Sequence, residues 1–324
     1  MPLPRLTLVS MLACATAAAA RQPAEPPTAG AAPEPSPQAE STPPSSPEAP
    51  PQRPITYSLG VRGDFNFNAG LSDAPGNVTV TRADLSFDVG IPVGLRGQFG
   101  ISLDAERSHY NFSDATTFVP NDPDTNFDAN ITSLSFSFAR QENETWGWLV
   151  GGGFGAGFES GAHIDQSLFA TGFGGVRYAI NEKVRIALGA IVTTQIEDNP
   201  LILPLLGLDW RFDERTSISS EGKPGLTLAY ALDSSWIVRT GFTYESRNFR
   251  LDRDGPIPNG VARDTRLPVF IGIRYAPHRQ IDIDLAGGVM FMQTLEVDDS
   301  EGVELSEEDV DTTPFLRISV AFKF

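Results

Sequence analysis

Polar and apolar residues alternate one by one through successive segments of about ten residues along most of this chain. The first clear segment places its charged residues, Arg62 and Asp64, on one face. Its large apolar residues occupy the other face, and they are Tyr57, Leu59, Val61, Phe65 and Phe67. Period-two alternation is typical of β-strands that have one polar and one apolar side, so the chain is predicted to be all-β.

The connections between these segments separate a membrane barrel from a soluble β-sandwich, which alternates in the same way. Short turns are expected at 90–94, 141–145, 181–183, 213–215, 233–235 and 277–279. Mostly longer polar connections lie between them, at 70–77, 108–126, 159–166, 197–199, 252–262 and 296–312. Short turns on one side and long loops on the other are typical of transmembrane barrels.

With every short turn on one side, the chain divides into fourteen strands of an antiparallel up-and-down β-barrel. They are expected near 55–68, 78–90, 95–107, 128–140, 145–158, 167–180, 183–195, 200–213, 216–222, 224–232, 235–250, 263–276, 280–294 and 313–324. The count depends on a tight turn at Glu221–Gly225. If that hairpin is instead one bent strand, the number of strands must still be even, and the chain divides into twelve strands.

Aromatic residues fall at the strand ends next to the short turns, although the assignment did not use them. The predicted girdle comprises Tyr57, Trp146, Trp148, Trp210, Trp236 and Tyr275. Aromatic rings with a polar tip favour the membrane interface, which supports a periplasmic position for the short turns.

The last strand alternates up to a terminal phenylalanine. It resembles the C-terminal signature of bacterial outer-membrane proteins at Arg317, Ser319, Phe322 and Phe324, with Ser319 in the place of the usual glycine. The resemblance implies recognition by the barrel-assembly machinery.

The first 54 residues are expected to serve export rather than folding. Residues 1–20 have one early charge, a short apolar stretch and small residues before a cleavage point, which is the pattern of a signal peptide. Lipoprotein cleavage before Cys14, the only cysteine, stays open as an alternative. Residues 21–54 contain twelve prolines and no large apolar residue, so they are predicted to be a disordered linker. The barrel is assigned to 55–324, in the outer membrane of a Gram-negative-type bacterium.

Charge indicates what the barrel does not bind and what lines it. From residue 55 onward the chain has 21 basic and 37 acidic residues, a net charge of −16, which argues against nucleic acid as a partner. Outer-membrane lipids are the expected partners. The lumen-lining candidates are Arg62, Asp64, Arg82, Asp84, Asp104, Arg239, Glu245, Arg266, Arg274, Asp282 and Asp284. These side chains are compatible with a lumen that is filled by ion pairs, or with a water-filled channel that selects among solutes.

No catalytic residue, metal ligand or cofactor is predicted. The acidic segment 295–312 lacks the spacing of a defined calcium loop and is expected to be a solvated outside loop. His163 and Ser167 lie at the level where barrel-type lipid hydrolases carry a Ser–His pair, but no residue to orient the histidine accompanies them.

The second half of the chain is similar to an uncharacterised outer-membrane barrel family, the domain of unknown function numbered 6268. The suggestive pieces are Lys223–Tyr230, Trp236, Asp264–Val269, Tyr275, Gly287–Gly288 and Phe324. The resemblance implies a barrel in the outer membrane and brings no substrate. Three functions are carried forward: a porin-like channel for small solutes, a closed structural or surface-binding barrel, and, with least support, a lipid hydrolase. Solute and oligomeric state are left open.

Overall fold

The alternating segments form β-strands in the computed structural model, which describes residues 53–116, 124–220 and 224–324. The strands are β1 (Thr56–Gly70), β2 (Asn77–Val93), β3 (Gly97–Ser113), β4 (Asn126–Gln141), β5 (Trp146–Glu159), β6 (Leu168–Ala179), β7 (Val184–Gln195), β8 (Asp198–Arg211), β9 (Thr216–Ser219), β10 (Gly225–Ala231), β11 (Trp236–Thr243), β12 (Glu245–Arg250), β13 (Val261–His278), β14 (Ile281–Asp298), β15 (Glu304–Val310) and β16 (Thr313–Lys323).

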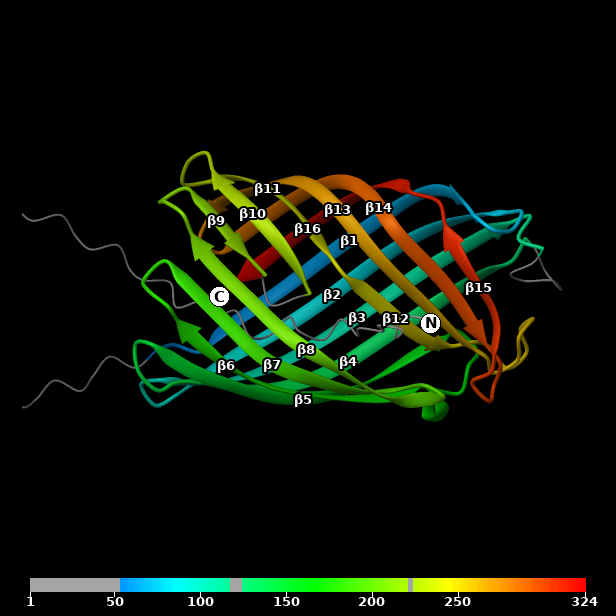
Figure 1. Cartoon of the computed structure of the whole chain (residues 1–324), viewed down its shortest axis with the longest axis horizontal. Coiled ribbons are helices and arrows are strands. Elements are labelled where there is room, and N and C mark those ends of the chain that lie inside the picture. The colour runs from blue at the N-terminus through cyan, green and yellow to red at the C-terminus, as the bar shows by residue number, and fades with distance from the viewer. Residues whose placement is uncertain (1–52, 117–123, 221–223) are drawn as a thin grey trace, which may run out of the picture.

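These strands close into an antiparallel barrel (Figure 1). Strands β1 to β11 pair in chain order, after which β11 pairs with β13, β13 with β14, β14 with β16, and β16 with β1. Strand β12 continues β11 along β13, and β15 folds back onto β14. The ring therefore has fourteen strands, which confirms the prediction. The twelve-strand alternative is wrong, because β9 and β10 pair as separate strands.

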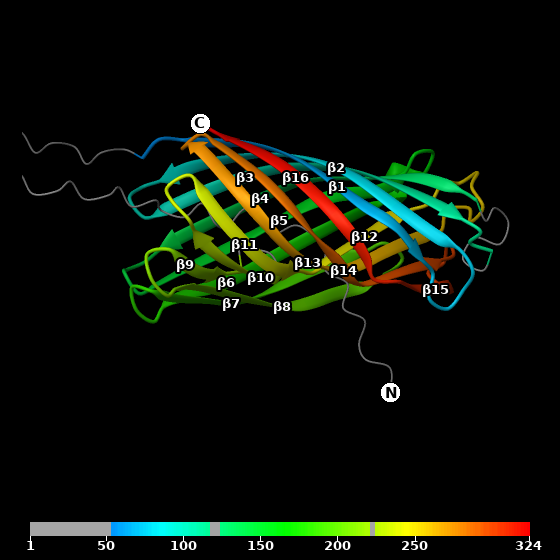
Figure 2. The same cartoon turned by 90° about the horizontal axis from the view of Figure 1, so that it is seen from above.

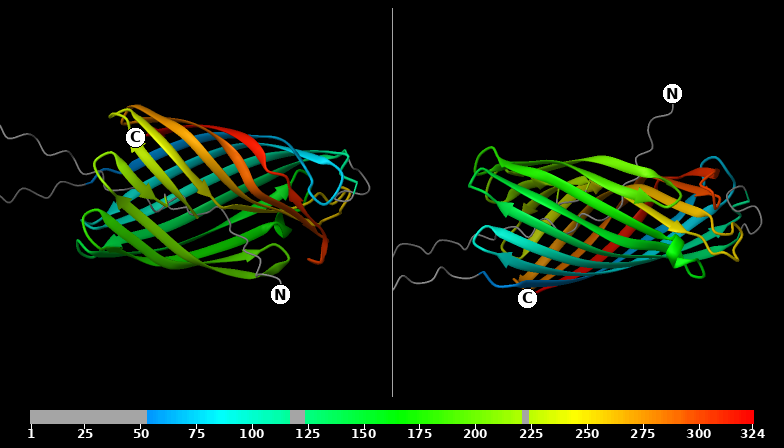
Figure 3. Two further views of the ribbon diagram at one scale, coloured as in Figure 1. Left: turned by 45° about the horizontal axis from the view of Figure 1, so that its top comes forward. Right: turned by 90° about the horizontal axis from the view of Figure 1, so that it is seen from below.

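The outward face of the barrel is apolar, as the alternation predicts. Val61, Leu85 and Leu103 are about half exposed, whereas the side chains of Asp64 and Arg82 are buried. Figures 2 and 3 show the strands tilted against the long axis of the tube, as closure of a sheet requires. An apolar outer surface on a closed ring of strands is the form in which strands cross a membrane.

Four of the short turns share one stabilising interaction, made by an Asn or Asp side chain near the start of the turn. Asn143, Asn181, Asp213 and Asp233 each accept backbone N–H groups from the residues two and three positions later through one side-chain oxygen. Such side chains satisfy the turn backbone without a long loop. We call this side of the barrel the short-turn end, and the opposite side the long-loop end.

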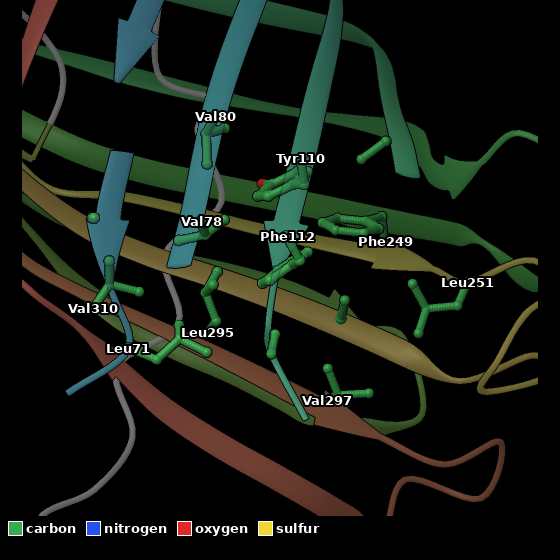
Figure 4. Close-up of a cluster of buried hydrophobic side chains, with 14 residues drawn as sticks. Leu71, Val78, Val80, Tyr110, Phe112, Phe249, Leu251, Leu295, Val297 and Val310 are labelled. Carbon is green, nitrogen blue, oxygen red and sulfur yellow. The ribbon is translucent and has the colours of Figure 1, made fainter. Parts of the chain in front are cut away.

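The long-loop end carries a hydrophobic core (Figure 4). Tyr110 and Phe112 at the end of β3 contribute to it, and Phe249 of β12 packs beside Tyr110 with ring centroids 5.6 Å apart. Leu295 and Val297 of β14 complete it together with Val310 of β15. Since these side chains come from β1–β4 and β12–β15, the core joins these two parts of the long-loop end.

Two predictions about this end are wrong. The segment 295–312 is not a solvated loop: β14 continues to Asp298, and β15 pairs with it from Glu304 to Val310. The expected strand 235–250 is interrupted at Tyr244, and all six residues of β12 are buried on both faces. A strand in the barrel wall would expose every second side chain, so β12 lies inside the barrel instead.

The predicted signal peptide (1–20) and the linker up to residue 52 lie outside the described residues, so their assignment stays a prediction. Within the described part of the chain, no helix is long and apolar enough to cross a bilayer. The one helical segment there is the short turn η1 (Ile164–Gln166), between β5 and β6.

Candidate functional site

Charged side chains from β1–β3, β12, β13 and β16 meet in the middle of the lumen. Five arginines and five carboxylates form one connected network, and they are Arg62, Arg82, Arg247, Arg266, Arg317, Asp64, Asp84, Glu106, Glu245 and Asp264. The set is balanced in charge. Balance matters here, because an unpaired buried charge is costly whereas a paired one is tolerated.

Glu245, the first residue of β12, is the centre of this network. Its carboxylate accepts hydrogen bonds from Arg266 at 2.6 and 2.8 Å, and from Arg247 and Arg317 at 3.1 Å each. Arg317 also binds Asp64 of β1 in bidentate fashion, at 2.5 and 3.1 Å. Through these contacts, β12 is tied to β13 and to the seam between β1 and β16.

Two further groups of contacts join β12 and β13 to the opposite wall. Arg247 makes a bidentate pair with Glu106 of β3, at 2.5 and 2.8 Å. Asp264 of β13 pairs with Arg82 of β2, and it also accepts from the Tyr110 hydroxyl at 2.8 Å and from Gln293 at 3.0 Å. Arginine suits such sites because its planar fork matches a carboxylate.

The remaining predicted lumen residues lie toward the short-turn end. Asp284 is 2.5 Å from Arg239 and 3.4 Å from Arg274, and Asp282 pairs with Lys323 at 2.5 Å. Asp104 lines a cavity described below. Sequence reasoning did not select Asp264, Tyr110 or Gln293. Tyr110 lies beyond the expected end of its strand at 107, and Gln293 lies next to the expected end of its strand at 294. Asp264 could have been found, because it lies on the same face of its strand as Arg266 and Arg274.

Strand β12 is held at its far end by Arg250, whose guanidinium joins three connections of the long-loop end. It donates to the backbone carbonyl of Gln166 at 2.9 Å and to that of Asn259 at 2.7 Å, and it pairs with Glu197. Arg250 also makes a bridge to Phe158 of β5, on the far side of the lumen from β13. Strand β12 therefore pairs with β13 along its whole length and meets β5 at its last residue.

A cavity of about 300 Å³ lies beside β12. Its lining includes Arg62, Asp84 and Glu106 from the charged network, and Phe169, Gln195 and Ile196 from the β6–β7 side. The inner wall of β5–β8 is apolar, with Leu149, Phe173, Ile191 and Leu205 packed in one cluster. The lumen thus has a charged side and an apolar side, and the size of the cavity is at the lower end of the range of about 300–1,000 Å³ that small-molecule sites occupy.

The predicted girdle residues all lie at strand ends next to the short turns. Tyr57, Trp146, Trp210 and Trp236 are each about 40% exposed, and Trp236 stacks on Tyr275 with ring centroids 4.3 Å apart. Trp148 donates through Nε1 to Glu142 at 2.8 Å. Phe324 lies at the same end, where its backbone exchanges two hydrogen bonds with Tyr57.

The Ser–His pair does not have the geometry of a hydrolase. The Ser167 hydroxyl is buried and donates to the backbone carbonyl of His163 at 2.7 Å, rather than to its imidazole. Among residues 53–116, 124–220 and 224–324, no group of three or more His, Cys, Asp or Glu side chains is arranged to hold a metal ion.

Several solved membrane barrels resemble this fold. The deltaS2 mutant of the monoaromatic hydrocarbon channel TodX is 10% identical, with a TM-score of 0.46 over 83% of this chain and 90% of that one. An outer-membrane channel from Pseudomonas putida F1 is 10% identical, with a TM-score of 0.45 over 88% and 100%. The KdgM porin in complex with disordered oligogalacturonate is 10% identical, with a TM-score of 0.35 over 82% and 99%. With sequence identities and TM-scores this low, no substrate or mechanism of these proteins can be assigned to this chain.

No curated protein matches the sequence. One family model does, over residues 126–323, which is more than half of the chain. The protein therefore belongs to the family described as "Domain of unknown function (DUF6268)".

Proposed function

We propose that this protein is an outer-membrane channel for small solutes, whose lumen is narrowed by the inserted strand β12. The observation that carries the proposal is the position of β12, which has all six residues buried and lies next to a cavity of about 300 Å³. A barrel that served only as a scaffold would need no space at its centre. A wide porin would not have a strand across its interior.

The outer membrane is the proposed location. Fourteen strands with an apolar outer surface and aromatic residues at the short-turn end suit a bilayer. We place the short turns in the periplasm and the long loops outside the cell. We further propose that a signal peptide directs export and that the barrel-assembly machinery recognises Arg317, Ser319, Phe322 and Phe324 during insertion.

The charged network and the hydrophobic core of the long-loop end act together as a constriction. The core closes much of the outer mouth with Phe112, Phe249 and Leu295. Below it, Glu245 and Arg247 connect β12 to three walls of the barrel. Passage therefore requires either a small solute or a displacement of β12, so a low conductance is expected.

Single-channel recording of the refolded full chain in a planar bilayer tests the proposal. The wild type should give small openings. A charge-balanced variant, Glu106→Gln with Arg247→Gln, removes a tie between β12 and β3 and should give larger or longer openings. The matched control is Arg107→Gln with Asp128→Asn, an ion pair of 2.7 Å at the exposed long-loop end, which should conduct like the wild type.

A heat-dependent gel shift and β-rich circular dichroism would establish that each variant is folded. If the folded wild type and the Glu106/Arg247 variant were both silent, the channel proposal would be refuted, and the closed structural barrel would remain. If both conducted equally, β12 would not be the constriction.

A further inference from the structure

One strand of the barrel wall lacks a neighbour along much of its length. Strand β8 pairs with β7 from Leu201 to Trp210, but on its other side it pairs with β9 only from Asp209 to Arg211. In the described part of the chain, no strand pairs with that side of β8 between Asp198 and Gly207. At the long-loop end this stretch is bounded by two ion pairs, of Glu197 with Arg250 and of Asp198 with Arg263.

The unpaired stretch lies at membrane depth. Trp210 marks the interface at the short-turn end of β8, and a membrane strand spans the hydrocarbon with about 9–11 residues. Ile202 and Leu206 point outward and are 68% and 70% exposed, whereas Leu188 and Val192 of the fully paired strand β7 are 51% and 43% exposed.

The edge of β8 is a poor template for another strand. Leu208 donates its backbone N–H to Ser220 on the open side, at 3.3 Å, so by alternation the even-numbered residues of β8 direct their nitrogens to that side. Pro200 and Pro204 are among them, and proline has no N–H to donate. Prolines at an edge prevent pairing with a second chain, so a β-sheet contact between copies does not explain this edge.

An unpaired edge at this depth is tolerated only where it borders a polar or water-filled space. The cavity beside β12 is such a space, because it reaches the residues that frame the open stretch. Pro224 precedes β10, Tyr244 follows β11, and Gln195 with Ile196 lies at the turn between β7 and β8. The lumen therefore communicates with the gap in the wall.

Two polar atoms in the lining of this cavity have no hydrogen-bond partner among the described residues. They are Nε2 of Gln195, a donor, and Oδ1 of Asn248, an acceptor, and the Asn248 residue is only 8% exposed. A buried polar group without a partner is costly, so a guest that both accepts and donates a hydrogen bond would be favoured here. The apolar side chains of Phe169 and Ile196 line the same cavity.

We infer that the gap between β8 and the β10–β12 side is a lateral exit, through which a small apolar molecule with one hydroxyl-like group leaves the lumen for the membrane. Gln195 and Asn248 hold its polar group, and Phe169 and Ile196 contact its apolar body. The inference rests on the proposed channel function and names the class of solute and its route.

Lipid access to the inner wall tests the exit. In a Cys14→Ser background of the full chain, Leu205→Cys or Leu149→Cys is labelled with bimane, and the protein is refolded into vesicles that carry a nitroxide on the lipid acyl chain. Both side chains point inward and belong to one apolar cluster. They also lie at the same height in the barrel, because Leu149 pairs with Gly175, Gly175 with Gly189, and Gly189 with Leu205. Only Leu205 borders the gap. Severalfold stronger quenching at position 205 is expected. Equal quenching would overturn the exit.

Leu203→Cys serves as a second reporter beside the gap if Leu205→Cys does not fold. This readout is independent of conductance. A silent barrel with strong quenching at position 205 would refute the channel but not the opening, whereas a conducting barrel without that quenching would refute only the opening.

Binding of 1-naphthol, compared with naphthalene, tests the polar group. Replacing Gln195 or Asn248 by leucine should weaken 1-naphthol binding about fivefold for each lost hydrogen bond, and it should leave naphthalene binding unchanged. Equal effects on the two probes, or none, would overturn the assignment of these two residues.

Discussion

Neutralising Glu245 should destabilise the barrel more than any exposed charge change. In Glu245→Gln, the amide keeps the size of the side chain but leaves five buried arginines against four carboxylates. Removing one partner of a buried ion pair costs about 3–5 kcal/mol. Arg247 keeps Glu106 and Arg317 keeps Asp64, and only Arg266 is left with a distant partner, Asp64 at 3.7 Å. The lower end, about 3 kcal/mol, is therefore expected.

The assay is urea unfolding of the vesicle-inserted protein, followed by tryptophan fluorescence. All four tryptophans lie at the short-turn end, away from Glu245, so their signal reports unfolding that has spread to that end. The matched control is Asp128→Asn, which removes the charge of an exposed pair with Arg107 and should change the free energy of unfolding by less than about 1 kcal/mol.

A second variant separates charge imbalance from lost packing. Glu245→Gln with Arg266→Met restores the balance of the network and retains the apolar stem of the arginine, so it should recover most of the lost stability. Two results would refute the reasoning: a Glu245→Gln variant as stable as the control, or a double variant as unstable as Glu245→Gln alone.

Three further predictions concern the two ends of the barrel. At the long-loop end, burial raises the pKa of Asp298 from 3.8 to about 6, and the pairing with Arg263 offsets this only in part. The folded state therefore holds more protons between these values, so the protection of β15 amides, taken relative to the intrinsic exchange rate at each pH, should fall as the pH rises from about 4 to about 6, and Asp298→Asn should flatten that dependence. Trp236→Ala removes the ring that stacks on Tyr275 and should lower the free energy of unfolding by about 1–2 kcal/mol in urea titrations, whereas the exposed Leu232→Ala at the same end serves as a control. Deletion of Phe324 removes the backbone pair with Tyr57 and should reduce the folded barrel in membrane fractions while leaving export intact, and normal membrane levels would contradict this.

The ring of strands could be predicted because its signals are local. Alternation assigns each residue to a face, and Asn143, Asn181, Asp213 and Asp233 mark four of the short turns within three or four residues of sequence. The polar face of β1 and β2 likewise predicts which side chains are buried. None of these inferences requires knowledge of residues far apart in the chain.

The partners within the lumen could not be predicted, because they depend on closure. Arg82 and Asp264 are separated by 182 positions, and Asp64 and Arg317 by 253. Which arginine meets which carboxylate is decided by the shear of the barrel, not by spacing. The strand β15 was missed for a related reason: Glu304–Val310 is acidic and reads as a loop, yet pairing with β14 buries Val310 and Glu308.

The inward position of β12 has one sequence signal, and it lies in another strand. Gly157 of β5 faces the backbone of β12 so closely that a Cβ atom there would collide with the carbonyl oxygen of Asn248. Glycine at this position permits the close approach that the bridge between Phe158 and Arg250 requires. Because β12 leaves the wall to reach β5, the wall beside β8 has no strand to complete it. The constriction of the lumen and the gap in the wall are thus two consequences of one displacement.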